Sequence, residues 1–82
     1  MTYRVEFEGD ALERLNGLPR NAFDALVESV VGLVRDPWNA NEMAPSQGAP
    51  YREAFFGDYG LLSFRVDERT ELIRIFGILW AG

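Results

Sequence analysis

The second half of the sequence contains three short runs of aromatic and branched aliphatic residues, and these runs most constrain the fold. Gly57-Asp58 separates the first run from the second, and residues 67–70 separate the second from the third. Runs of strongly β-forming residues bounded by Gly and Asp are typical of strands joined by tight turns. This half therefore predicts a three-stranded antiparallel meander.

The first half predicts one strand followed by two helices. In residues 3–8 apolar and charged side chains alternate, as in a half-buried strand. Asp10 is a suitable N-cap for a short helix. From Asn21 to Arg35 the sequence follows the 3.6-residue period of an amphipathic helix, which Asp36-Pro37 ends. The apolar stripes of the two helices are Ala11, Leu12, Leu15 and Leu18, and then Phe23, Leu26, Val27, Val30, Val31 and Val34.

Together these elements predict a single α+β domain over residues 1–82. Its order is an N-terminal strand, a helical hairpin and the meander, with both helices on one face of a small sheet. Residues 37–50 hold three of the four prolines and show little periodicity, which predicts a long loop that is functional or mobile. We expect Trp38, early in this loop, to close the core between helices and sheet.

Alternation along the last two strands assigns side chains to two faces of the sheet. We expect the branched aliphatic set, including Ile73 and Ile75, to face the helices. The opposite face then carries Arg4, Arg65, Arg74, Phe76, Ile78 and Trp80. This mixture is too apolar for a surface left in water, so we expect a protein partner to cover it. The predicted partner-binding residues are Arg74, Phe76, Ile78 and Trp80, with Trp80 as the anchor.

Composition excludes several classes of function. The chain has neither Cys nor His, which removes disulfides and the usual zinc sites, and we expect no metal and no cofactor. No apolar run is long enough for a membrane helix, and the N-terminus lacks the apolar core of a signal peptide, so we expect a cytoplasmic protein with no membrane association. The net charge is −5, and neither half of the chain is basic. This charge argues against a large nucleic-acid-binding surface.

Several short motifs, taken in order, resemble the RelE/ParE superfamily of bacterial toxins. They are Val34-Arg35-Asp36-Pro37 at the end of a helix, Tyr51-Arg52, Gly57-Asp58-Tyr59-Gly60-Leu61-Leu62 and Val66-Asp67-Glu68. The resemblance covers nearly the whole chain and implies the RelE/ParE-like fold. It also implies a toxin that inhibits growth, by cleaving mRNA at the ribosome or by blocking another target, and that a cognate antitoxin holds inactive.

The chain departs from the RelE pattern where that pattern carries chemistry. The family places an Arg directly after Gly-Asp-Tyr, and this chain has Gly60 there. The family also has a basic residue or His near the end of the last strand, where this chain has residues 77–80, Gly-Ile-Leu-Trp. The remaining cationic candidates for catalysis are Arg52, Arg65 and Arg74, with Glu53, Tyr51 and Tyr59 as acid or base groups. Alternatively, Arg65 and Arg74 pair across neighbouring strands with acidic residues such as Glu6, Glu53 or Glu71. The position of Arg52 in the family pattern is as easily that of a structural or antitoxin-contacting residue.

Two functional hypotheses follow. The first is a RelE/ParE-like toxin component with weak or lost mRNA-cleaving activity. The second is a non-catalytic protein-binding or dimerisation module derived from the same fold. Whether the chain is an enzyme stays open; if it is one, the resemblance implies a ribosome-dependent mRNA endoribonuclease. The expected partner is a cognate antitoxin or a second copy of the chain, and the acidic balance gives binding of the ribosome or mRNA little support.

Overall fold

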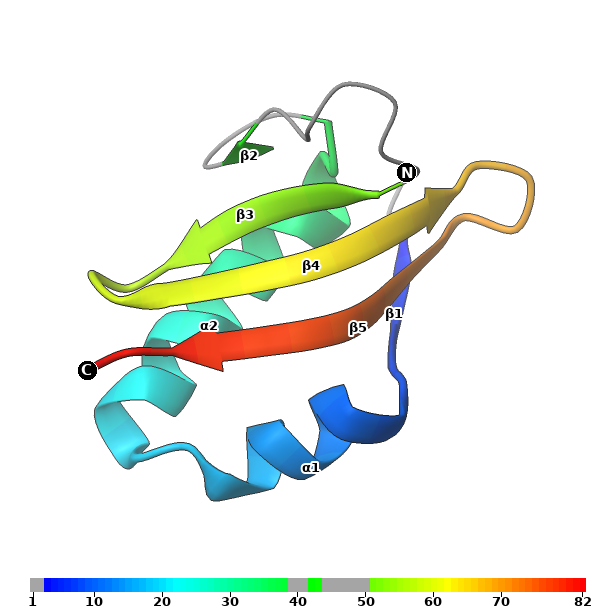
Figure 1. The fold of residues 1–82 in the computed structure, drawn as a ribbon. Coiled ribbons are helices and arrows are strands. Elements are labelled where there is room, and N and C mark those ends of the chain that lie inside the picture. The colour runs from blue at the N-terminus through cyan, green and yellow to red at the C-terminus, as the bar shows by residue number, and fades with distance from the viewer. Residues whose placement is uncertain (1–2, 39–41, 44–50) are drawn as a thin grey trace.

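The computed structural model describes residues 3–38, 42–43 and 51–82. Its elements, shown in Figure 1, are β1 (Arg4–Phe7), α1 (Gly9–Gly17), α2 (Arg20–Arg35), β2 (Glu42–Met43), β3 (Arg52–Phe56), β4 (Gly60–Asp67) and β5 (Leu72–Trp80). The strands β3, β4 and β5 form an antiparallel meander. The predicted order of strand, helical hairpin and meander is confirmed.

The sheet has the strand order β1-β5-β4-β3-β2. β1 lies parallel to β5, and the other neighbouring strands are antiparallel. β2 is a pair of residues that bonds to the outer edge of β3, so the prediction of a loop throughout residues 37–50 is wrong at Glu42 and Met43. A pairing of this length depends on the free edge of β3 and leaves no periodic signal in the sequence. Residues 39–41 and 44–50 lie outside the described part of the chain.

The helices begin and end close to the predicted positions, with one difference. α1 begins at Gly9, whose φ of 38° lies in the left-handed region that glycine tolerates. Its N-cap residue is Glu8, so the prediction that Asp10 is the N-cap is wrong. Asp10 lies instead in the first turn, where a carboxylate favours the positive end of the helix dipole.

The helices cover one face of the sheet, and the core between them is apolar. In Figure 1, α2 runs behind β3, β4 and β5, and α1 lies below β5. Ser29 of α2 also donates a hydrogen bond to the backbone oxygen of Phe55, at 3.0 Å. Burial of apolar surface is the main favourable term in the folding of such a layer pair. The buried core residues are Ala11, Ala22, Leu26, Leu33, Ala54, Phe56, Leu62, Phe64, Ile73, Ile75 and Ile78.

A β-bulge in β5 changes which side chains face the helices. Ser63 pairs with Gly77 but Phe64 pairs with Ile75, so Phe76 is an extra residue on β5. One extra residue reverses the alternation of side chains beyond it. The predicted helix-facing positions up to Ile75 are confirmed, because Ile73 and Ile75 are fully buried.

Beyond the bulge the predicted faces are wrong. Ile78 is 5% exposed in the core and Trp80 packs against that core, whereas Leu79 is 61% exposed. The expected cluster of Phe76, Ile78 and Trp80 therefore does not form on the face opposite the helices. We call this the uncovered face, because neither described helix lies on it. Of these three side chains, Phe76 alone lies on that face, where it contacts Arg65.

Candidate functional site

Two of the three candidate catalytic arginines lie opposite one another on the uncovered face of the sheet. Arg65 of β4 and Arg74 of β5 are direct cross-strand partners, and both are exposed. Like charges directly opposite one another across a sheet are destabilising. In this structure each guanidinium has its own separate partner.

The guanidinium of Arg65 lies over an aromatic ring. Its guanidinium carbon lies 4.5 Å from the centroid of the Phe76 ring, and Tyr51 packs edge-on against the same ring with centroids 5.5 Å apart. A cation over an aromatic face at an exposed site is worth about 0.5–1 kcal/mol. The candidate acid or base group Tyr51 is thus connected to Arg65 through Phe76.

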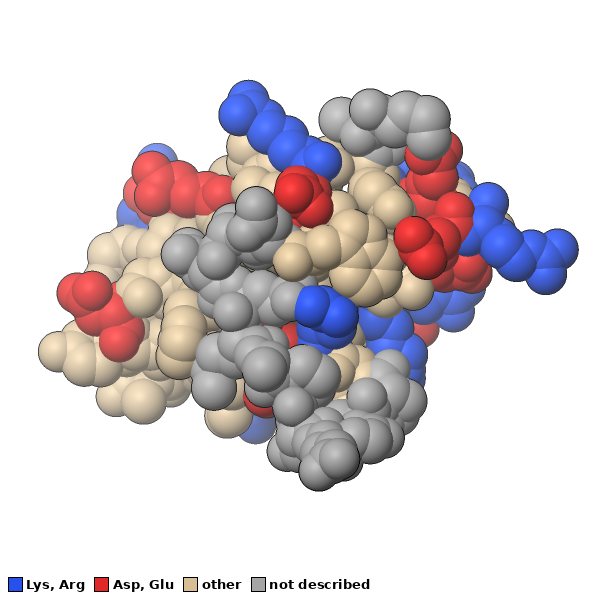
Figure 2. Space-filling view, turned by 90° about the horizontal axis from the view of Figure 1, so that it is seen from above, with Lys and Arg blue, Asp and Glu red and all other residues tan. Residues whose placement is uncertain are grey.

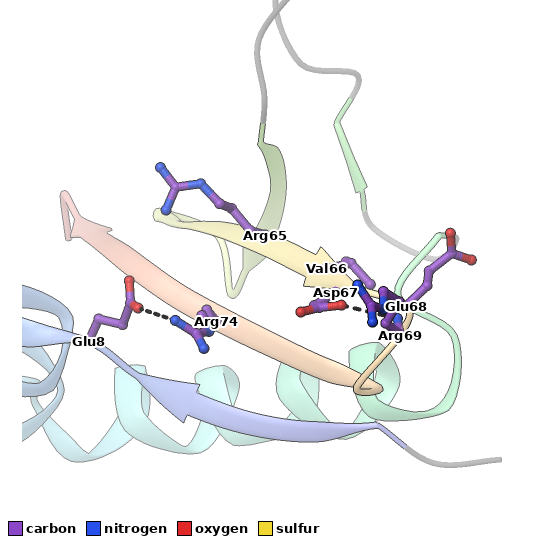
Figure 3. Close-up of a pocket in the computed structure, with 7 residues that line it drawn as sticks. All are labelled: Glu8, Arg65, Val66, Asp67, Glu68, Arg69 and Arg74. Atoms are coloured by element: carbon purple, nitrogen blue, oxygen red, sulfur yellow. Dashed lines mark hydrogen bonds and ion pairs between the residues drawn. The ribbon is translucent and has the colours of Figure 1, made fainter.

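Arg74 points toward a carboxylate. Its Nη1 lies 3.5 Å from Oε2 of Glu8, at the start of α1, and the two side chains are 49% and 38% exposed. Exposed pairs of this kind contribute at most about 1 kcal/mol. In Figure 3, Arg74 points toward Glu8, while Arg65 projects away from this pair. Arg74 therefore pairs with an acidic residue, as the alternative predicted, but this residue is the N-cap of α1 and does not belong to a neighbouring strand.

Both arginines line a surface hollow of about 430 Å³, which we call the charged hollow. The residues around it are Glu8, Arg65, Val66, Asp67, Glu68, Arg69 and Arg74. Three arginines and three acidic residues cancel in formal charge, so the hollow lacks the positive excess that attracts phosphates. On the face drawn in Figure 2, basic and acidic side chains are likewise interleaved, and no broad area is uniformly basic.

Asp67 stabilises the turn between β4 and β5. Its Oδ1 accepts hydrogen bonds from the backbone N–H groups of Arg69 and Thr70, at 3.0 and 3.4 Å. Hydrogen bonds from the side chain and backbone of Thr70 lower the pKa of the Asp67 carboxyl below its usual value of 3.8. Asp67 is therefore an anion at neutral pH, which suits a turn-stabilising role and does not suit a proton donor.

Arg52 does not join the other two arginines. Arg52 is the first residue of β3 and is the cross-strand partner of Phe64, a buried core residue. Cross-strand partners share a face, so Arg52 lies on the helix-facing side of the sheet. Its guanidinium lies 4.9 Å from the centroid of the Trp38 ring. The expectation that Trp38 closes the core is wrong, because Trp38 is 42% exposed and the neighbouring Pro37 is buried instead.

Gly60 is enclosed by its neighbours. It pairs with Phe56 on one side and Trp80 on the other, and it is buried. A β-carbon at this position would collide with the backbone oxygen and the ring of Phe56. The position at which the family resemblance places an Arg therefore has no room for any side chain in this structure.

The other two candidate acid or base groups lie on different parts of the sheet. Tyr59 packs against Trp80, with ring centroids 6.2 Å apart, at the end of β4 that is remote from Arg65. Glu53 of β3 is in register with Ser63 on the uncovered face. Tyr51 is therefore the candidate that the described contacts connect to an arginine.

Sequence reasoning missed two apolar surfaces. On the uncovered face, Leu61 lies between Phe55 and Leu79, which are 49% and 61% exposed; we call these three residues the sheet patch. The sheet patch forms because the bulge turns Leu79 to this face. Gly77, next to Phe76, was the signal in the sequence, since glycine inside a strand often marks a bulge.

The second missed surface lies on the helical hairpin. It is an apolar hollow of about 170 Å³, which we call the helical groove. The expected apolar stripe of α2 is split, because Leu26 is buried while Phe23, Val27 and Val31 stay at the surface. The groove is lined by Phe7, Leu15, Phe23, Leu26, Val27, Val30 and Val31.

We searched the described residues for a metal-binding cluster and for a membrane-spanning helix and found neither. Among them, no group of three or more acidic side chains is placed to hold a metal ion. None of the described helices has the length and apolar character that crossing a membrane requires. Among the surfaces of the described residues, the charged hollow, the sheet patch and the helical groove are candidates for function.

Solved structures of RelE-containing complexes share this fold over nearly the whole chain. The RelBE2 toxin–antitoxin complex from Mycobacterium tuberculosis matches with a TM-score of 0.83 at 24% identity, covering 99% of this chain and 100% of that chain. The intact RelBE toxin–antitoxin complex from E. coli matches with a TM-score of 0.79 at 18% identity, covering 98% of each chain. An archaeal RelE–RelB complex from Pyrococcus horikoshii OT3 matches with a TM-score of 0.76 at 21% identity, covering 100% of this chain and 98% of that chain.

These matches establish a RelE-like fold. The sequence itself matches no protein-family model and no curated protein. Because one fold can carry different functions, the activity has to be argued from the site.

Proposed function

We propose that this chain is a RelE-like toxin component of a bacterial toxin–antitoxin system, with weak or lost mRNA-cleaving activity. The observation that carries the toxin assignment is the full-length structural likeness to chains from toxin–antitoxin complexes. The local chemistry of the charged hollow and of Gly60 supports the reduced activity.

RNA cleavage through the 2′-hydroxyl needs a base, an acid and cationic stabilisation of the phosphorane. Arg65 and Arg74 are the candidate cations that lie together, and the hollow they share holds as many acidic residues as basic ones. Gly60 cannot supply another cation. Since one electrostatic contact to a transition state is worth about 10²–10³ in rate, we expect cleavage to be slow or absent.

Cleavage of A-site mRNA on programmed ribosomes tests this proposal. The E. coli RelE toxin serves as the active reference, and an Arg65→Ala/Arg74→Ala variant shows whether any residual cleavage depends on the paired arginines. We expect little product from the wild-type chain. Cutting at a rate comparable to that of the reference would refute the loss of activity and leave the toxin assignment in place.

We propose further that a protein partner, an antitoxin, covers the uncovered face of the sheet. Arg74 and Phe76 remain partner-binding candidates on that face, and the sheet patch joins them. Ile78 and Trp80 pack in or against the core, on the other side of the sheet. Co-expression with the product of the neighbouring gene, followed by co-purification, tests for such a partner. A Leu79→Ser variant should weaken the complex if the sheet patch is covered.

The second candidate function is a non-catalytic protein-binding or dimerisation module. Two apolar surfaces on so small a domain favour it, because such surfaces mark sites of protein interaction. The two functions differ in one readout: the module binds its partner but does not arrest growth when expressed alone. Sedimentation equilibrium of the isolated chain would detect the dimerisation form of this alternative.

A further inference from the structure

β1 is the last strand on its side of the sheet, and its outer edge is open (Figure 1). The backbone N–H groups of Arg4 and of Glu8, directly after β1, donate hydrogen bonds of 2.8 and 2.9 Å toward β5. Because N–H groups alternate in direction along a strand, those of Val5 and Phe7 point away from β5. Neither has a backbone partner among the described residues. Unpaired groups of this kind are a template for a further strand.

The charges on β1 restrict which strand can pair with it. Charged side chains usually discourage pairing at a sheet edge. The two exposed side chains of β1, however, have opposite signs: they are Arg4 and Glu6, and neither makes an ion pair within the described part of the chain. Opposite charges directly across an antiparallel pair are stabilising, and like charges are destabilising. A pairing strand must therefore place an acid opposite Arg4 and a base opposite Glu6.

A second copy of β1 meets both requirements in a two-fold antiparallel pairing centred on Val5. In this register Val5 lies opposite Val5 of the second copy, Arg4 lies opposite Glu6, and Tyr3 lies opposite Phe7. Both charge requirements are met twice, once on each side of the axis. Centring the pairing one residue earlier or later would set Arg4 or Glu6 against the same residue of the second copy, like charge against like.

The backbone groups that are free on the outer edge fit the same register. Val5 N–H would donate to the carbonyl of Val5 in the second copy, and Phe7 N–H would donate to the carbonyl of Tyr3. The N–H of Tyr3 needs no such acceptor, because it already donates to the backbone oxygen of Val34 at 3.1 Å. On the helix-facing side, Tyr3 and Phe7 are half-buried, and an aromatic cross-strand pair is favourable there.

We propose that β1 pairs with β1 of a second copy of this chain in this register, so that the two sheets join edge to edge. The self-complementary order of Arg4, Val5 and Glu6 chooses the second copy as the occupant. The contact is short, so the dimer is weak and forms at high protein concentration. The inference does not depend on the proposed function, because a toxin and a binding module can both dimerise through this edge.

Charge reversal tests the register. In Arg4→Glu and in Glu6→Arg, both cross-strand ion pairs become like-charged pairs, and sedimentation equilibrium at low salt should show dimerisation weakened about 10-fold for each variant. An equimolar mixture of the two variants restores opposite charges at both positions of a mixed dimer. We therefore expect the mixture to dimerise about as tightly as the wild-type chain. A mixture that dimerises no better than its components would overturn the proposal.

Matched controls separate the edge from overall charge. Arg69→Glu and Glu68→Arg make the same two changes of charge at exposed positions of the β4–β5 turn. They should leave dimerisation unchanged, and their mixture should show no gain. Equal effects of the two sets of variants would indicate general electrostatic repulsion and contradict pairing through β1.

Val5→Pro tests the backbone part without a change of charge. Proline is tolerated on an edge strand where its nitrogen faces away from the sheet, so the fold should persist by circular dichroism, while the dimer should be lost. A wild-type chain that stays monomeric up to about 1 mM would overturn the proposal. Binding of the antitoxin by such a monomer, lost on Val5→Pro, would assign the edge to the antitoxin instead. None of these measurements uses cleavage or growth arrest, so failure here is distinguishable from failure of the proposed function.

Discussion

At the scale of single residues, Gly60 limits what the sheet can carry. Its neighbours Phe56 and Trp80 stack with ring centroids 5.8 Å apart and 21° between their planes. Gly60 lies beside this stack at the start of β4, where the Phe56 ring and carbonyl occupy the space of a β-carbon. Introducing an Arg here would therefore disrupt the packing of Phe56 before it could add a cation to the sheet.

We predict that Gly60→Ala destabilises the protein by about 2 kcal/mol or more, since a single inserted methyl in a filled site forces backbone or ring to move. Gly32→Ala is the matched control. Gly32 lies in α2, and a β-carbon there would meet nothing within 4 Å, so alanine should stabilise the protein by about 0.5–1 kcal/mol. Urea unfolding of both variants measures the difference. Equal free energies of unfolding for the two variants would show that the sheet accommodates a methyl group at position 60 without loss of stability.

At the scale of elements, β5 shows where local pattern stops being sufficient. At Ile73, Arg74 and Ile75 the alternation of the sequence gives the right face, because the two isoleucines are buried and Arg74 is exposed. The bulge at Phe76 then shifts the register against β4, and a shift of one residue exchanges the two faces for the rest of the strand. Hydrophobicity could not reveal this, because Ile78, Leu79 and Trp80 are all apolar and either alternation satisfies the pattern.

The same limit applies to the helices and to the site. The period of α2 predicted its extent, but its apolar residues cover more than one stripe. Packing in the folded chain decides that Leu26 is buried and Val27 is exposed. Pairing of Arg65 with Arg74 depends on cross-strand register, and the contact between Arg74 and Glu8 joins residues distant in the sequence. Such contacts are set by tertiary structure, which a single sequence does not display.

Two adjacent residues of β5 test the new face assignment. We predict that Trp80→Ala destabilises the fold by about 2–3 kcal/mol, less than for a fully buried Trp because Trp80 is half-buried. Leu79→Ala should change stability by no more than about 0.5 kcal/mol, since Leu79 is 61% exposed. Chemical denaturation of both variants is the measurement. A larger loss of stability for Leu79→Ala than for Trp80→Ala would show that the side chains follow the alternation expected without the bulge.

Trp80→Phe refines this test. The indole Nε1 is buried and has no hydrogen-bond partner among the described residues, which is a desolvation cost. Phenylalanine keeps an aromatic ring against Phe56 and removes this donor. The variant should therefore lose much less stability than Trp80→Ala, and an equal loss would mean that the indole makes a polar contact in solution.

At the scale of the whole molecule, charge sets the affinity for nucleic acid. The chain carries thirteen acidic and eight basic residues. The two arginines that meet on the uncovered face lie in a hollow of balanced charge. Affinity for RNA or DNA grows with the number of phosphate counterions that basic residues release. An acidic molecule with a neutral site releases few of them, so its affinity for a polyanion should be low.

We therefore predict that binding to single-stranded RNA at physiological salt is no tighter than about 10⁻⁴ M, the weak end of non-specific binding. Anisotropy titrations of labelled RNA at several salt concentrations test this, with the E. coli RelE toxin as the reference. A Glu8→Gln/Glu68→Gln variant gives the hollow a net charge of +2 and should bind more tightly, with a steeper dependence on salt. Submicromolar affinity of the wild-type chain with a steep salt slope would mean that local placement of Arg65 and Arg74 outweighs the overall charge.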